Sequence, residues 1–377
     1  MTRPSAGFDS RRIVAILIVG IIGVLIPGLQ PQLLGALAVE GRLSATALGE
    51  LATVELLAMG IAAGGAGFAF APSRLPRIAA VALIVAGAID LLTPRLDLAL
   101  IFPARIVAGL AEGVLIWIAI GFIIRSPRPE RWSGAYLALQ TLAQCALAIV
   151  IGGTGAGSAA AFALLGVVTL AGLVAVPWLP AAYAAHDEAV TGRPSARGLA
   201  ALGGVLLYLA FIVAVWVYLE PLGLQRGIDP ATVRMVVPLA LAMQVLGAAA
   251  ATLLAGRMPA RVAVAMVAIV NLGLLAVVAA APSGAAFVVA TAAFGFLWLF
   301  VMPFQIPIVI AADRGRRAAM LIGGAQLIGS SLGPFLAALL VSDADVGPVL
   351  WFGAACAAMG AVILIGAGSL RRARPES

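Results

Sequence analysis

Long apolar segments recur along almost the whole 377-residue chain, and they limit its fold more than any other feature. A helix that crosses the hydrocarbon core of a bilayer needs about 20 mostly apolar residues. Short stretches with Gly, Pro, Arg or Asp, which end helices, separate twelve such segments. The expected spans are 12–38, 45–70, 77–94, 98–124, 133–153, 158–179, 199–221, 230–254, 261–281, 285–311, 318–341 and 347–370. The sequence therefore predicts an all-α membrane protein with 12 transmembrane helices.

The composition indicates that lipid is the solvent for many of these side chains. Hydrophobic residues make up 63% of the chain and charged residues 10%, whereas soluble domains have about 45–50% and about 25%. Cys145 and Cys356 lie inside apolar runs, so we expect no disulfide framework, no metal site and no cofactor. The single histidine, His186, lies in a polar segment and is expected to be a solvated loop residue.

Every basic residue is an arginine, and the arginines divide unevenly between the two sides of the predicted bundle. If the N-terminus is cytoplasmic and the spans alternate, 18 of the 23 arginines fall on the cytoplasmic side, and Arg105 lies within a helix. The opposite side then holds only Arg42, Arg95, Arg226 and Arg234. This bias follows the positive-inside rule. We expect a bacterial inner-membrane protein with both termini in the cytoplasm, and, because the arginines set orientation, no nucleic-acid partner.

A polar segment over residues 180–198 divides the chain near its middle. We expect residues 1–180 to form an N-terminal six-helix bundle and residues 199–377 a C-terminal one. Residues 181–198 are then a cytoplasmic linker between the two bundles.

The two halves repeat each other at a spacing of about 183–186 residues. Arg131 precedes Gln140 by nine residues, and Arg317 precedes Gln326 by nine. Ser44 and Asp229 are the expected N-caps of equivalent helices, the second and the eighth. A duplication of this kind is typical of transporters, in which the substrate site lies between the repeats near the bilayer midplane.

Several motifs resemble those of the major facilitator superfamily. Residues 105–113 (RIVAGLAEG) are similar to the fourth-helix motif of that family, an arginine followed by spaced small residues. Residues 313–317 (DRGRR) and 329–334 (GSSLGP) also resemble it. Two features differ, because the loop at 71–74 (APSR) has no acidic residue and the fifth helix has no Gly-Pro element. The resemblance implies two pseudo-symmetric six-helix bundles that perform secondary active transport, with helices three, six, nine and twelve outside the central cavity.

Three ionisable residues lie deep in predicted spans, where a charge costs about 2.5–3.5 kcal/mol. Arg105 and Glu112 are seven residues apart, on one helix face and roughly 10 Å apart along the axis. We expect this separation to be too long for a direct salt bridge and to leave space for a solute or a third residue. With Glu55 in the second helix, they are the candidate proton-coupling residues; the alternative is a static buried pair that fixes helix packing. Interfacial solvation is expected for three carboxylates near helix ends, Glu50, Asp90 and Glu220.

Amide and aromatic side chains are concentrated in the helices that the resemblance places around the cavity. The amides are alternatively explained as hydrogen-bonding links between helices, and the aromatics as lipid-facing or core residues. Phe300 and Phe304 share a helix face, while Trp298 points elsewhere. Prolines in 27–31 and 303–307 are candidate bending points. The predicted substrate-binding residues are Gln30, Gln140, Gln144, Gln244, Phe300, Phe304, Gln305 and Gln326.

A proton-coupled exporter of a small organic or amphipathic compound is the function that these features favour. The alternatives are a proton symporter that takes up a metabolite such as a sugar or organic acid, and a receptor or scaffold that does not transport. The glycine-rich run at 152–157 has no lysine and falls at a predicted turn, so ATP is not expected as the energy source. No nucleophile–base pair lies at membrane depth, so an enzyme is not expected. The expected partners are a small solute, protons and the bilayer, and the expected state is a monomer.

Overall fold

The computed structural model describes residues 9–69, 73–126, 129–155, 157–183, 194–254, 256–280, 283–313 and 317–368. Helices and short connections account for the described chain, apart from an isolated antiparallel bridge between Ser73 and Ala182. His186 and most of the expected linker lie outside the described residues.

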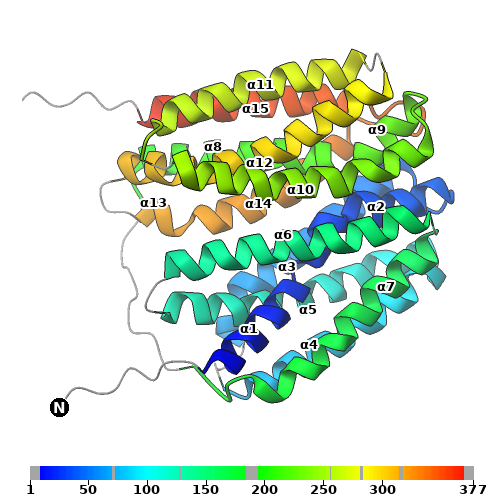
Figure 1. Ribbon diagram of the computed structural model, residues 1–377, viewed down its shortest axis with the longest axis vertical. Helices are drawn as coiled ribbons and strands as arrows, with labels where there is room; N and C mark the ends of the chain where they lie inside the picture. The colour runs from blue at the N-terminus through cyan, green and yellow to red at the C-terminus, as the bar shows by residue number, and fades with distance from the viewer. Residues whose placement is uncertain are drawn as a thin grey trace, which may run out of the picture.

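The helices form two bundles that follow the order of the chain. Figure 1 shows α1 to α7 in the lower half of the molecule and α8 to α15 in the upper half. The N-terminal bundle contains α1 (Ser10–Ile22), α2 (Leu25–Val39), α3 (Ala45–Ala69), α4 (Leu75–Leu92), the 3₁₀ turn η1 (Thr93–Arg95), α5 (Leu98–Arg125), α6 (Pro129–Thr154), α7 (Ser158–Ala171) and the 3₁₀ helix η2 (Gly172–Trp178). The C-terminal bundle contains α8 (Ala196–Val217), α9 (Leu219–Gln225), α10 (Pro230–Leu254), α11 (Ala260–Ala280), α12 (Gly284–Ala312), α13 (Arg317–Met320), α14 (Ile322–Ala338) and α15 (Pro348–Gly368).

Eleven helical segments of the described chain are long and apolar enough to cross a membrane. The twelfth expected span, 318–341, is divided at Leu321 into α13 and α14, and α14 has 17 residues. The chain is therefore a multi-pass, all-α membrane protein, as predicted. We call the helix ends nearest Arg11, Arg77 and Arg257 the Arg-rich end, and those nearest Arg42, Arg95 and Arg234 the Arg-poor end.

Both predicted N-caps are confirmed. The Ser44 hydroxyl accepts a hydrogen bond from the Ala47 backbone N–H at 3.1 Å. The Asp229 carboxylate accepts one from the Thr232 backbone N–H at 3.0 Å. Each cap satisfies one of the backbone donors that a helix start leaves free.

The first span is broken at Gly23 and Val24, several residues before the expected bending point. Pro27 explains this position, because it lacks the N–H that would donate to the carbonyl four residues earlier, at Gly23. Gln144 of α6 satisfies the next carbonyl, since its Nε2 donates to the Val24 oxygen at 2.5 Å. By contrast, α12 stays continuous through its two internal prolines.

Candidate functional site

Arg105 lies at the centre of an ion-pair cluster inside the N-terminal bundle. It projects from α5 and is fully buried. Its Nε donates to Glu55 Oε1 of α3 at 2.6 Å, and its Nη2 donates to the same oxygen. Its Nη1 donates to Asp90 Oδ1 of α4 at 2.6 Å. One guanidinium thus joins carboxylates from two other helices.

Asp90 belongs to this cluster, although interfacial solvation was its expected environment. The side chain is fully buried, and Thr169 of α7 donates to its second oxygen at 3.3 Å. The short turn η1 links α4 to α5, so the end of α4 and the start of α5 lie at the same depth in the membrane. Nearness to a helix end in the sequence therefore did not mean exposure here.

Glu112 approaches Arg105 directly, which corrects the expectation that the two are too far apart for a salt bridge. Glu112 Oε1 lies 3.7 Å from Arg105 Nη2. Side chains on a helix lean toward its N-terminus, so the Glu112 carboxylate is displaced toward the turn that carries Arg105. Its other oxygen, Oε2, is buried and has no hydrogen-bond partner within the described residues. Glu112 is therefore the least firmly held carboxylate of the cluster.

The cluster contains more negative than positive groups. Three carboxylates surround one guanidinium, so full ionisation would give a net charge of −2. The nearby groups are uncharged: Gln30 Nε2 lies 3.5 Å from Glu55 Oε2, and the Phe162 ring centroid lies 5.6 Å from the Arg105 guanidinium. An uncompensated charge in a dry bundle is costly. The cluster is thus suited to hold a proton on one carboxyl group.

The break in the first span packs against the turn that carries Glu112. A Cβ atom on Gly23 would lie 2.7 Å from the Glu112 carbonyl oxygen and 2.9 Å from Leu115 Cβ. Only glycine permits this approach. A movement of α1 relative to α2 would therefore displace the backbone at Glu112.

Contacts between the two bundles gather toward the Arg-poor end. Tyr218 Oη donates to the Ala45 carbonyl at 2.8 Å, and the Ala45 N–H donates to Asp343 Oδ1 at 2.6 Å. Gln32 Nε2 reaches the Arg234 carbonyl at 3.4 Å. In Figure 1, α2 and α9 lie beside each other at this end of the molecule. The bundles are therefore closed together at the Arg-poor end.

Glycines of α3 and α14 show that this contact does not extend to the Arg-rich end. A Cβ atom on Gly49 of α3 would lie 2.8 Å from the Pro334 carbonyl of α14. One on Gly60 would lie 3.4 Å from Leu327 Cβ, and one on Gly64 would meet no described atom within 4 Å. Gly324 of α14 is likewise unobstructed. The two helices diverge toward the Arg-rich end.

The predicted substrate residues occupy several different environments. Gln30 contacts Glu55 of the ion-pair cluster. Gln144 donates a hydrogen bond to the Val24 carbonyl, at the break in the first span. Gln140 and Gln326 are half-buried on α6 and α14, which pack against α10 and α3 of the opposite bundle. These two residues therefore lie on helices that pack across the interface between the bundles.

The remaining candidates lie in the C-terminal bundle. Phe300 and Phe304 are buried with their ring centroids 5.4 Å apart, which confirms the shared face, while Trp298 packs on Trp216 instead. Gln244 is buried. Gln305 lines a small cavity with Asn271, and no amide atom of either has a hydrogen-bond partner within the described residues.

Glu220 is buried, not solvated at an interface as expected. It projects from α9 and lines two cavities of about 410 and 230 Å³ between the bundles at the Arg-poor end. Glu50 is half-buried. A short helix after Val217, with its own buried face, was not visible in the hydropathy pattern, and this is why Glu220 was misplaced.

Comparisons with known proteins show the fold. No family model matches the chain, and no curated protein matches it. A D-xylose–proton symporter superposes with a TM-score of 0.70 at 13% identity, over 94% of this chain and 95% of that chain. A mutant of the nucleoside transporter NupG superposes with a TM-score of 0.72 at 11% identity, over 94% and 99%. The major facilitator superfamily transporter FucP, in an outward conformation, gives 0.61 at 14% identity, over 98% and 100%. The chain has the major facilitator fold, with two bundles as predicted.

Proposed function

We propose that this protein is a proton-coupled secondary transporter that moves a small organic solute by alternating access. The observation that carries the proposal is the buried cluster of three carboxylates around Arg105, in which one oxygen of Glu112 has no hydrogen-bond partner among the described residues. The fold supports transport, since similar structures at 11–14% identity include a symporter and a nucleoside transporter.

Glu112 is the proposed proton carrier. Arg105 donates hydrogen bonds to Glu55 and Asp90, whereas Glu112 lies 3.7 Å from it, so protonation of Glu112 need not break the two closer contacts. A proton on Glu112 brings the cluster nearer to neutrality and favours a dry, closed arrangement; loss of that proton favours one that admits water. Gly23 packs against the helical turn that carries Glu112. Through this contact, we expect the protonation of Glu112 to be coupled to the angle between α1 and α2.

Orientation follows from the arginine bias. We propose that the Arg-rich end faces the cytoplasm of a bacterial inner membrane, with both termini on that side. The structure then represents a state closed to the outside. The proposed solute site lies between the bundles, where Gln140 and Gln326 are half-buried at equivalent positions of the repeat.

Export of a small organic or amphipathic compound is the proposed direction. The second candidate is proton-linked uptake of a sugar or another metabolite. That candidate is favoured by the D-xylose–proton symporter among the similar structures.

A solute screen tests the function. Purified protein in detergent is heated with sugars, nucleosides, organic acids and amphipathic cations. A true solute raises the unfolding temperature because it binds only the folded state. It is then tested in proteoliposomes, where an imposed pH gradient should drive its movement. A protein that binds no class of solute, or whose bound solute never crosses the membrane, is a receptor or scaffold.

Filling the contact at Gly152 should prevent closure of the Arg-poor end. A Cβ atom there would lie 2.7 Å from the Arg234 carbonyl oxygen across the bundle interface. Gly152→Val should destabilise the closed state by about 1–3 kcal/mol, a shift of roughly 5- to 150-fold. Accessibility is measured with a cysteine at Leu48, which lines the 410 Å³ cavity, in a protein whose Cys145 and Cys356 are replaced by alanine. This cysteine should react faster with an impermeant maleimide in the Gly152→Val variant than in the protein with Gly152.

Gly153→Val is the matched control. A Cβ atom on Gly153 meets no described atom within 4 Å, although the residue is adjacent on the same helix. Labelling should therefore stay at the level of the parent protein. Equal labelling in both valine variants would show that helix propensity, and not closure, determines accessibility.

A further inference from the structure

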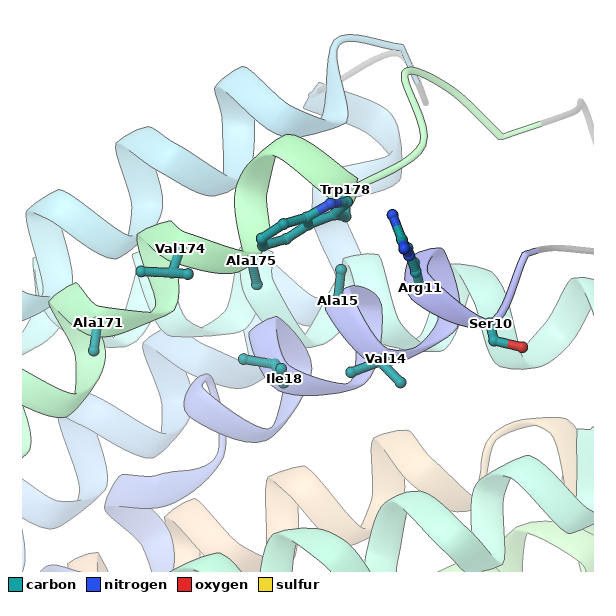
Figure 2. A pocket seen from close by; sticks show the side chains of 9 residues that line it. All are labelled: Ser10, Arg11, Val14, Ala15, Ile18, Ala171, Val174, Ala175 and Trp178. Carbon is teal, nitrogen blue, oxygen red and sulfur yellow. The ribbon is translucent and has the colours of Figure 1, made fainter.

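A cavity of about 770 Å³ opens between α1 and η2 on the perimeter of the N-terminal bundle (Figure 2). The two elements touch at one end, where a Cβ atom on Gly172 would lie 2.4 Å from Ile22 Cδ1. From that contact the cavity extends toward Arg11 and Trp178 at the Arg-rich end. Small side chains such as Ala175 form its floor, so the described residues do not fill the space between the two elements.

The walls of this groove face the bilayer. Val14 is 54% exposed, Ile18 is 40% exposed and Val174 is 68% exposed. All three lie in segments long and apolar enough to cross the membrane. The distance from Arg11 to Ile18 along α1 is about 10 Å. An apolar groove of this depth on a membrane-spanning surface is suited to an acyl chain.

The mouth of the groove, unlike its walls, carries polar side chains. Among the described residues that line the cavity, Arg11 is the only charged one, and the polar residue Ser10 precedes it in the chain. Figure 2 shows the Arg11 side chain and the Trp178 indole at the same end of the groove. Arg11 is exposed and makes no ion pair or hydrogen bond within the described part of the chain. Tryptophan and arginine are enriched at the headgroup level, where an indole and a guanidinium both meet polar groups.

We propose that this groove binds an anionic phospholipid, with its phosphate on Arg11 and an acyl chain along Val14, Ile18 and Val174. The acyl chain accounts for the apolar walls. The phosphate accounts for the Arg11 guanidinium at the mouth, which has no partner among the described residues and which a zwitterionic lipid satisfies less well. The bound lipid fills the space between α1 and η2 and holds α1 against the bundle. The site does not depend on the identity of the transported solute.

Lipid retention tests the site. The full-length protein is reconstituted in nanodiscs with equal amounts of phosphatidylglycerol and phosphatidylcholine, and the lipids retained after extraction are counted by native mass spectrometry. Because one arginine near an anionic headgroup contributes about 1 kcal/mol, phosphatidylglycerol should be preferred about 5-fold. Arg11→Gln should remove the preference, while the matched variant Arg12→Gln, on the same helix but outside the groove, should keep it. Soluble glycerol phosphate should not displace the lipid, because it lacks the acyl chain.

A second variant tests the apolar part. Ala171 is an exposed residue that lines the groove, and Ala171→Phe should reduce retention of both lipids because the larger side chain occupies the space of the acyl chain. The proposal is overturned if Arg11→Gln keeps the preference or if Arg12→Gln loses it equally. It is also overturned if Ala171→Phe retains as many lipids as the parent protein, or if glycerol phosphate displaces them.

Discussion

Glu112→Gln will fold and bind solute but will lose proton-driven transport. Glutamine has nearly the same shape as glutamate, yet it cannot gain or lose a proton. The fold should survive, because the hydrogen bonds of Arg105 to Glu55 and Asp90 do not involve Glu112. The contact of Glu112 with the guanidinium, at 3.7 Å, is longer than those two, so its loss costs less. In proteoliposomes, accumulation or extrusion driven by a pH gradient should fall to background, while solute exchange at equal pH continues.

The control for this prediction is Glu50→Gln. Glu50 is a half-buried carboxyl group on the same helix as Glu55, and no ion pair among the described residues joins it to the cluster. This variant should keep its dependence on the pH gradient. A direct readout is the number of protons released when solute binds to purified protein, which should drop only for Glu112→Gln. Proton release equal to that of the parent protein would assign coupling to another group.

Hydropathy predicted most of the fold, because it reflects the bilayer directly. A span must be long and apolar. Breaks within spans were harder to place. The break at Gly23 lies four residues before Pro27, so the proline that causes it is not where the chain bends. The interruption at Leu321 has no proline near it in the sequence. It divides a segment whose hydropathy predicts one continuous transmembrane helix.

The candidate site was predicted in part, and its omissions have a common cause. Arg105, Glu112 and Glu55 were identified because each lies deep in an apolar run. Asp90 was missed because depth was judged from its own helix alone. The short connection η1 contained the necessary signal, since a tight hairpin places residues on its two arms at equal depth. Contacts between distant helices, such as Tyr218 with Ala45, leave no such local signal.

The two bundles differ in how their polar interiors are satisfied. In the N-terminal bundle, α4 and α5 contribute Asp90 and Arg105, which pair. The corresponding helices of the C-terminal bundle, α11 and α12, contribute Asn271 and Gln305, which are neutral. This asymmetry is consistent with the proposal that the coupling site lies in the N-terminal bundle.

Arg105→Met will strongly destabilise the N-terminal bundle. It leaves Glu55, Asp90 and Glu112 buried without a cation, and removing one partner of a buried ion pair costs about 3–5 kcal/mol. The unfolding temperature in detergent should fall sharply, and little protein should be recovered. Arg105→Lys should restore only part of the loss, because one ammonium group cannot reproduce the fork that reaches Glu55 and Asp90 together.

Neutralising the partners should rescue stability but not transport. In Arg105→Met combined with Glu55→Gln and Asp90→Asn, the only carboxyl group left in the cluster is Glu112, which can be protonated, so most of the lost stability should return. Proton-driven transport should remain absent, since the cation beside Glu112 is gone. If the triple variant is no more stable than Arg105→Met, the cost lies in lost packing of the arginine side chain. If it also transports with an unchanged pH dependence, the cluster only holds the helices together and the coupling site lies elsewhere.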